Sequence, residues 1–262
     1  MNYLFSRRTI YHSLDAKIVA FSIFLFFLLL ILFPYTTDAS LVVNSSQNPG
    51  SLSQGLVGWW TMDGKNLINN VTDSSGLGNN GYMQGFGATS SAIVAGKLGQ
   101  GLKFDGVDDY VTRSSLSVIS KNNSFSVSLW FKWSSKSLTD HPTILQNTIS
   151  SSDLFTIQMT STAALTMGVY NGTAYSKVST PFTDTKSWHH LVAVYDGATI
   201  TGYLDDVLMS GSVNPSTGVV TGSLNIGHAD SGRYFKGFLD DVRIYSRALS
   251  ASEIKQLYNM GR

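Results

Sequence analysis

The chain has 262 residues, contains no cysteine and carries a formal net charge of +1. The lack of cysteine excludes disulfide frameworks and thiolate metal sites, and the near-neutral charge without Lys/Arg clusters excludes an electrostatic binder of nucleic acid. Charged residues make up only 13% and glycines number 24, a composition typical of short strands joined by uncharged turns rather than of long amphipathic helices.

The N-terminal region is predicted to direct export. An apolar run at 18–33 is preceded by Arg7, Arg8 and Lys17 and is followed by no basic residue before Lys65. This asymmetry predicts a cytoplasmic N-terminus and a translocated remainder. The run lies in length between a signal-peptide core and a membrane-spanning helix, so a cleaved signal peptide and a single-pass membrane anchor both remain open. We expect an extracellular or cell-surface protein, with a membrane contact through this segment.

Composition divides the chain into three parts. Residues 1–39 form the signal peptide or membrane anchor. Residues 40–55, rich in Ser, Asn, Gln and Gly, are predicted to form a flexible linker. Residues 56–262 are predicted to form one folded domain, because a single β-sandwich of about 200 residues is common.

Short runs rich in aromatic and β-branched residues recur from residue 56 onward, which predicts an all-β sandwich. In the run at 125–133, apolar residues alternate with Ser126, Ser128, Trp130 and Lys132, which predicts one buried and one partly polar face. Trp130 is therefore the tryptophan expected to be exposed and to contact a ligand. Further strands are predicted at 56–62, 101–104, 109–113, 143–147, 155–160, 164–170, 188–195, 199–205, 223–227 and 235–245.

Only the C-terminus has a helical pattern. Ser250 and Glu253 have the spacing of a capping box, and Ile254, Leu257 and Tyr258 follow on one helical face. We expect a short helix that closes the sandwich.

Six segments, in this order, carry a family resemblance. They are Gly58–Asp63 (GWWTMD), Asp73–Gly76 leading to Asn79–Gly81, Leu102–Val111 (LKFDGVDDYV), Phe125–Trp133, Trp188–Gly197 (WHHLVAVYDG), and Gly237–Tyr245 followed by Arg247–Ser250. Together they resemble the laminin G-like domains of bacterial surface proteins, within the concanavalin A-like lectin and glucanase superfamily. The resemblance spans roughly 56–258. It implies a jelly-roll sandwich of two antiparallel sheets, a structural calcium ion, and sugar or protein binding.

Catalysis is disfavoured by the acidic residues. Glycoside hydrolases need two carboxyl groups that flank the scissile bond, yet Glu253 is the only glutamate and belongs to the capping box. Neighbours in the pairs Asp205-Asp206 and Asp240-Asp241 are expected on opposite faces of a strand. His190 shares a face with Trp188, Val192 and Val194, which favours a hydrogen-bonded structural histidine. We expect no catalytic residues and no enzyme activity.

Asp240 is in phase with Phe238, Val242 and Ile244, so two-residue periodicity places its carboxylate on the apolar face. A buried carboxylate needs a partner. Calcium suits carboxylate, amide and carbonyl oxygens, and the resemblance places other candidate ligands in the same jelly roll. The predicted calcium ligands are Asp63, Asp73, Asn79, Asp105 and Asp240. The alternatives for Asp240 are a basic side chain or backbone amides.

Two functions remain open. The first is a carbohydrate-binding or adhesive surface module, because aromatic rings stack on sugar faces while polar groups bind hydroxyls. The second is a structural or protein-interaction module of the cell envelope that binds no sugar, because the tryptophans other than Trp130 are equally well explained as core. The expected partner is accordingly a glycan or a surface protein.

Overall fold

The computed structural model describes most of the chain after residue 50. The described residues are 51–64, 67, 70–87, 89–116, 123–134, 141–149, 152–170, 175–209, 222–229 and 232–262. The chain divides into two units, Met1–Ser46 and Gln47–Arg262. The predicted export segment and residues 40–50 of the predicted linker lie outside the described residues. Within the described ranges, no helix is long and apolar enough to cross a membrane.

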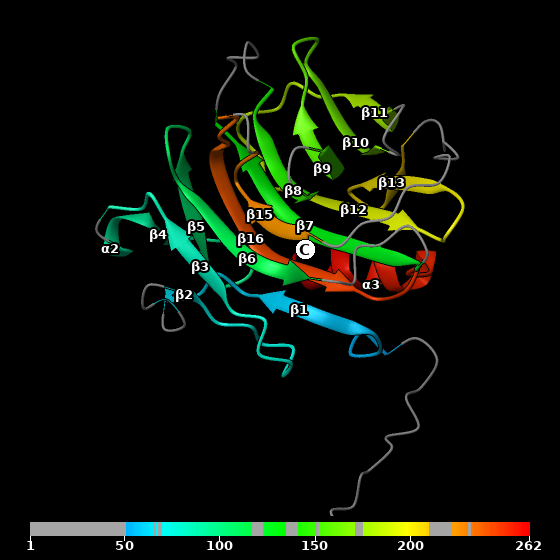
Figure 1. Cartoon of the computed structure of the whole chain (residues 1–262), viewed down its shortest axis with the longest axis horizontal. Helices are drawn as coiled ribbons and strands as arrows, with labels where there is room; N and C mark the ends of the chain where they lie inside the picture. Colours follow the sequence, from blue (N-terminus) through cyan, green and yellow to red (C-terminus); the bar gives the residue numbers. More distant parts are fainter. Residues whose placement is uncertain are drawn as a thin grey trace, which may run out of the picture. The chain divides into compact units, whose positions relative to one another are not determined.

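Two antiparallel sheets of eight strands each make up the sandwich in the described part of the chain (Figure 1). Sheet A has the order β14 (Val207–Leu208), β13 (Ile200–Leu204), β12 (His189–Tyr195), β7 (Phe125–Trp133), β16 (Lys236–Tyr245), β5 (Gln100–Asp105) and β4 (Ile93–Ala95), and β1 (Leu56–Trp60) also pairs with β16. Sheet B has the order β11 (Tyr175–Pro181), β10 (Ala164–Tyr170), β9 (Ser152–Met159), β8 (Thr143–Ile149), β15 (Gly222–Ile226), β6 (Tyr110–Leu116), β3 (Gly81–Gln84) and β2 (Asn70–Val71). The predicted jelly-roll class is confirmed.

The main core lies between the inner faces of the two sheets. Leu129 and Phe131 of β7 alternate inward from sheet A, and Phe155 and Ile157 of β9 do the same from sheet B. Each is at most 1% exposed. Full burial of such a side chain contributes about 1.5–3 kcal/mol, so a cysteine-free domain of this size is stabilised by its core.

A β-bulge in β16 changes which residues face that core. The pairing of β16 with β7 shifts between Asp240 and Arg243, and Asp241 has φ 48°. Leu239 and Val242 both belong to the main core, so the two residues between them lie outside the simple alternation. The prediction that Asp240 shares the apolar face of Val242 is therefore wrong, because one extra residue reverses the phase of a strand.

The helix α3 (Ala251–Met260) packs on the outer face of sheet A instead of closing the sandwich (Figure 1). Its Ile254 and Leu257 form a second buried cluster with Val192 and Val194 of β12. The predicted capping box is confirmed. Ser250 accepts from the backbone N–H of Glu253, whose side chain accepts from the backbone N–H of Ser250.

Residues 51–55, which the sequence assigns to the linker, are hydrogen-bonded to the folded domain. The Arg247 guanidinium donates to the carbonyl oxygens of Ser51 and Gln54, at 3.3 Å and 2.8 Å. The backbone N–H of Ser246 donates to the carbonyl of Gly55 at 2.7 Å. These hydrogen bonds attach the segment immediately before β1 to the folded domain.

A short four-residue helix, α2 (Thr89–Ala92), precedes β4. It lies beside the β4–β5 hairpin in the described part of the chain (Figure 1).

Candidate functional site

The outer face of sheet B carries a row of polar side chains. Residues paired directly across antiparallel strands point to the same side of a sheet. Gln146 of β8 pairs with Thr156 of β9 on one side and with Asn225 of β15 on the other. Asn225 pairs in turn with Thr112 of β6, which pairs with Tyr82 of β3. The inner face at the same strands is apolar, so this sheet has one apolar and one polar face, and Gln146, Thr156 and Asn225 on the polar face are themselves buried.

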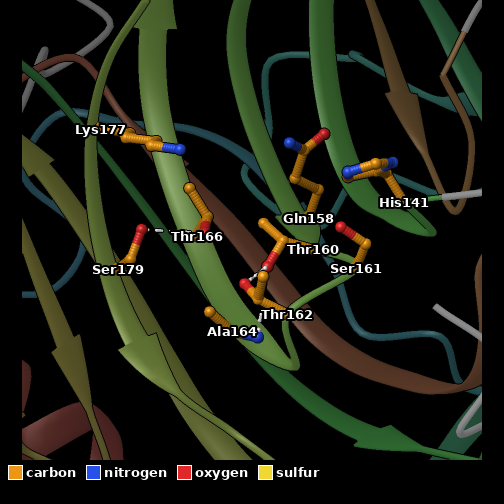
Figure 2. A pocket seen from close by; sticks show the side chains of 9 residues that line it. All are labelled: His141, Gln158, Thr160, Ser161, Thr162, Ala164, Thr166, Lys177 and Ser179. Carbon is orange, nitrogen blue, oxygen red and sulfur yellow. Dashed lines mark hydrogen bonds between the residues drawn. The ribbon is translucent and has the colours of Figure 1, made fainter. Parts of the chain in front are cut away.

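A cavity of about 320 Å³ opens at the β9–β11 end of this face (Figure 2). Its walls are polar apart from one alanine. The lining residues are His141, Gln158, Thr160, Ser161, Thr162, Ala164, Thr166, Lys177 and Ser179. We call this cavity the β9–β11 pocket.

Cross-strand pairing fixes the floor of the β9–β11 pocket. Thr166 of β10 pairs with Gln158 of β9 and with Ser179 of β11. The hydroxyls of Thr166 and Ser179 share a hydrogen bond of 3.0 Å, and those of Thr160 and Thr162 another of 3.0 Å. The floor is thus a set of hydroxyls that already have defined orientations.

Gln158 is oriented by a residue beside the pocket. An Nη1 hydrogen of Arg233 is donated to Oε1 of Gln158 at 3.2 Å. A guanidinium has no acceptor, so the carbonyl side of the Gln158 amide must face Arg233. The NH₂ side of the amide is therefore directed elsewhere, and in Figure 2 it lies on the side of Thr166.

His141 enters the pocket from a strained position. Its φ is 47°, in the left-handed region that costs a residue with a Cβ about 1 kcal/mol or more. Its carbonyl accepts from the Thr143 hydroxyl at 3.2 Å. Strained non-glycine residues are found at functional sites, and His141 is the one residue lining the pocket among the six described non-glycine residues with a positive φ.

Three half-buried rings form a cluster that does not line the pocket but includes the residue next to Arg233 in the chain. His228 and Tyr234 stack with ring centroids 4.5 Å apart, and Tyr110 lies 4.8 Å from His228. Tyr234 follows Arg233, the residue that contacts Gln158. Partly exposed aromatic surface beside polar groups is the combination that a sugar ring needs.

The predicted calcium ligands Asp73 and Asn79 lie together, but protein groups already bind their oxygens. Asp73 Oδ1 accepts from the backbone N–H of Trp59 at 2.9 Å and of Ser75 at 2.8 Å, and Oδ2 accepts from the Asn79 N–H at 2.8 Å. Asn79 Oδ1 accepts from Arg113 at 3.2 Å. These bonds hold the turn between β2 and β3 and attach it to β1.

Asp63 and Asp240 contact another turn, the one between β4 and β5. Asp63 Oδ1 accepts from the Gln100 N–H at 2.9 Å. Asp240 Oδ2 accepts from the N–H groups of Lys97 and Leu98, each at 2.7 Å. Backbone amides are thus the partners of Asp240, which was one of the alternatives open from the sequence.

Asp105 lies in an acidic cluster that the predicted set missed in part. Carboxylate oxygens of Asp105, Asp108 and Asp109 lie within 4.8 Å of one another, and among the described residues no other group of three or more His, Cys, Asp or Glu does so. Burial raises the pKa of Asp109, and the charges of Asp105 and Asp108 add to that rise. The cluster borders a cavity of about 210 Å³ that Lys103 also lines. The five predicted ligands therefore do not converge on one cluster.

Trp130 is buried, so the prediction that it is exposed for ligand contact is wrong. Its side chain is 1% exposed. Tyr258 of α3 stacks on it with centroids 5.8 Å apart, and the Lys97 ammonium lies 4.9 Å from its ring centroid. Alternation placed Trp130 on the outer face correctly, but α3 covers that face.

The paired histidines have separate structural partners. His190 is buried and its Nε2 shares a 2.9 Å hydrogen bond with the Ser128 hydroxyl, and burial lowers the pKa of His190 to about 3. His189 Nδ1 lies 2.7 Å from Asp205 Oδ2, and this hydrogen bond raises the pKa of His189. The expected hydrogen-bonded structural histidine at position 190 is confirmed.

Sequence reasoning missed the β9–β11 pocket. The polar positions Thr156 and Gln158 alternate with Phe155 and Ile157 in a strand that was predicted. That alternation was the available signal. The partner strand β11 was not predicted, because its sequence YSKVSTP has few apolar residues.

The comparisons with known proteins agree with this architecture. The family described as the concanavalin A-like lectin/glucanases superfamily matches residues 105–255, more than half of the chain. No curated protein sequence matches the chain.

Several solved structures have the same fold. The binding domain of Paraclostridial Mosquitocidal Protein 1 aligns at a TM-score of 0.63 with 16% identity, over 78% of this chain and 52% of that one. The binding domain of botulinum neurotoxin DC in complex with SialylT aligns at 0.63 with 15% identity, over 81% and 53%. The chain thus spans about half the length of these two toxin domains.

Domain 4 of AbnA, an extracellular GH43 arabinanase from Geobacillus stearothermophilus, was solved in complex with arabinotriose. It aligns at a TM-score of 0.59 with 23% identity, over 78% of this chain and 98% of that one. At these identities the likeness concerns the fold alone.

Proposed function

The chain belongs to the concanavalin A-like lectin/glucanases superfamily, and from that premise we propose that it is a non-catalytic binding module that holds a glycan in the β9–β11 pocket. The observation that carries the proposal is the pocket itself: hydroxyl and amide groups at defined positions on paired strands of the sheet. Small-ligand sites combine a concave surface with a few oriented polar groups.

The solved relatives support a binding role. One is the binding domain of botulinum neurotoxin DC in complex with SialylT, and another is an arabinanase domain in complex with arabinotriose. One fold hosts many functions, so a binding role for this chain depends on the residues of its own pocket.

The second candidate is a protein-interaction module that binds no sugar. Val207 and Leu208 favour it, because they are 68% and 59% exposed on the edge strand β14. A botulinum neurotoxin DC binding domain of the same fold was solved in complex with rat synaptotagmin II. Exposed apolar residues on a sheet edge suit contact with another chain.

Absence of catalysis is part of the proposal. Glu253, the single glutamate, forms a 2.6 Å ion pair with Arg247 and caps α3. That pairing lowers the pKa of Glu253 to about 2, which is opposite to the raised pKa that a catalytic proton donor needs.

Export to the cell surface and a structural Ca²⁺ ion also stand as proposals. The charge pattern around the apolar run supports export. For calcium, the acidic turn at Asp105, Asp108 and Asp109 supplies the most suitable donors in the described ranges, since it alone brings three carboxylates within 4.8 Å. Backbone N–H groups donate to Asp105 and Asp109 as well as to Asp63, Asp73 and Asp240, so the close approach of the three carboxylates is what favours this turn.

The test is a glycan array with the purified full-length chain, followed by calorimetric titration of the best oligosaccharide. Gln158→Ala should weaken binding about tenfold, since a lost hydrogen bond of this kind is worth about 1.4 kcal/mol. Gln256→Ala, at an exposed position on α3, should leave the affinity unchanged. An array without any signal would sink the glycan proposal and favour the protein-interaction module.

A further inference from the structure

The chemistry of the β9–β11 pocket is strongly biased toward hydrogen-bond donors. Lys177 carries an ammonium group with three donors and no acceptor. Gln158 presents its NH₂ side, because Arg233 occupies its carbonyl oxygen. The remaining polar contacts are hydroxyls, which both donate and accept, and the imidazole of His141.

The charge of the pocket has one sign. Among the described residues that line it, Lys177 is the one lysine or arginine and none is an aspartate or glutamate. The guanidinium of Arg233 lies behind Gln158, with its Nη1 3.2 Å from the amide oxygen. A neutral sugar offers donors and acceptors in similar number. A lining with this bias toward donors and positive charge would therefore keep some donors without an acceptor when it binds a neutral sugar.

Lys177 and His141 lie at opposite sides of the pocket floor. Figure 2 shows Lys177 on one side of Thr166 and His141 beyond Gln158 on the other. Lys177 lies on β11 and His141 directly precedes Pro142 and β8. The strand order β11-β10-β9-β8 separates them by three strand spacings, or about 14 Å. An acidic group held at the β11 side leaves room for a neutral part of the ligand over the hydroxyl floor.

We infer that the ligand of the β9–β11 pocket is an acidic glycan, whose carboxylate or sulfate oxygens are bound by Lys177 while its hydroxyls contact the partly exposed side chains of Gln158 and Ser179. This inference rests on the proposed glycan function and narrows it to one class. Carboxylate and sulfate oxygens only accept hydrogen bonds, and charge-assisted bonds from an ammonium are about twice as strong as neutral ones.

The test uses two matched pairs of probes with the full-length chain. Oligogalacturonate is compared with its fully methyl-esterified form, and dextran sulfate with dextran. We expect one charged member to bind at least tenfold tighter than its neutral counterpart in 20 mM salt, and the preference to shrink in 500 mM salt because the pocket is open to solvent. The pair that shows the preference identifies carboxylate or sulfate.

Three variants locate the preference. Lys177→Gln should abolish it and Lys177→Arg should preserve it, while Lys255→Gln, on the exposed side of α3, is the matched control for a lost positive charge. Urea unfolding of each variant shows that the fold is intact. Equal binding of charged and neutral probes would overturn the acidic-glycan inference and leave the glycan function standing. A preference that survives Lys177→Gln would also overturn it. Failure of all four probes and of the array would overturn both.

Discussion

Asp240 provides a test of the structure that does not depend on any ligand. Its side chain is fully buried, with Oδ2 bound to two backbone N–H groups at 2.7 Å. Its Oδ1 is buried without a hydrogen-bond partner among the described residues. Burial raises the pKa of Asp240 from 3.8 to about 7, against the lowering effect of the Leu98 and Lys97 amides.

The sign of the pH effect follows from that raised value. The unfolded chain ionises near 3.8 and the folded chain near 7, so the folded state binds the proton more tightly. The corresponding stability is fully present below pH 3.8 and is lost as pH rises to about 7. At about 1.4 kcal/mol per unit of pKa, wild type should lose roughly 2–3 kcal/mol of unfolding free energy between pH 5 and pH 8 through this group.

Asp240→Asn removes this titration. The amide oxygen still accepts the two N–H bonds, but its NH₂ replaces the unpartnered Oδ1, which costs about 1–3 kcal/mol at every pH. The variant should therefore be less stable than wild type at pH 5, and the difference should shrink or reverse by pH 8.

The assay is urea unfolding followed by tryptophan fluorescence at pH 5, 6, 7 and 8. Asp63→Asn controls for the loss of a negative charge beside the same turn. A difference between wild type and Asp240→Asn that stays constant across the range would refute the raised pKa. A parallel series with calcium and with chelator tests whether Asp240 is a calcium ligand or only accepts hydrogen bonds from backbone N–H groups. A calcium-dependent stability that Asp240→Asn abolishes would contradict the second role.

Three further predictions concern stability. Trp130→Ala should lower the unfolding free energy by about 3–5 kcal/mol, measured by urea unfolding, and a loss below 1 kcal/mol would show that α3 does not cover the ring. Glu253→Gln should remove stability that wild type has above pH 4.5 and loses as pH falls through about 2. We expect the unfolding free energy at pH 7 to fall by roughly 1 kcal/mol after solvent screening. An unchanged melting temperature would contradict the ion pair with Arg247. Calcium should raise the melting temperature relative to chelator, and Asp109→Asn should remove that rise; equal wild-type melting would end the calcium proposal.

The sandwich could be predicted from sequence because its strands obey a local rule. Alternation in β7 identified Leu129 and Phe131 as inward-facing, and the structure confirms both. The same rule failed at Asp240, since a bulge with a positive φ at Asp241 is stabilised by distant contacts: the indole of Trp59 donates to Asp241 at 2.6 Å. No pattern within β16 reports a partner 182 residues away in the chain.

The candidate site was beyond prediction for a related reason. Trp130 was correctly assigned to the outer face, but its exposure depends on α3, which packs there through Tyr258. The β9–β11 pocket needs Lys177 from a strand that was not predicted, and its Gln158 is oriented by Arg233, 75 residues later. Periodicity places a side chain on a face; what stands opposite that face is decided by tertiary packing.

The position of β16 has a consequence for how the molecule is made. This strand lies in the middle of sheet A, with β7 on one side and β5 and β1 on the other. It is nevertheless the last strand in the described chain. During synthesis β1 therefore emerges without the strand it pairs with, and the two halves of sheet A stay unjoined until residues 236–245 are available. Such non-local pairing slows folding, so a chain interrupted before β16 should remain incompletely folded however much of sheet B it contains.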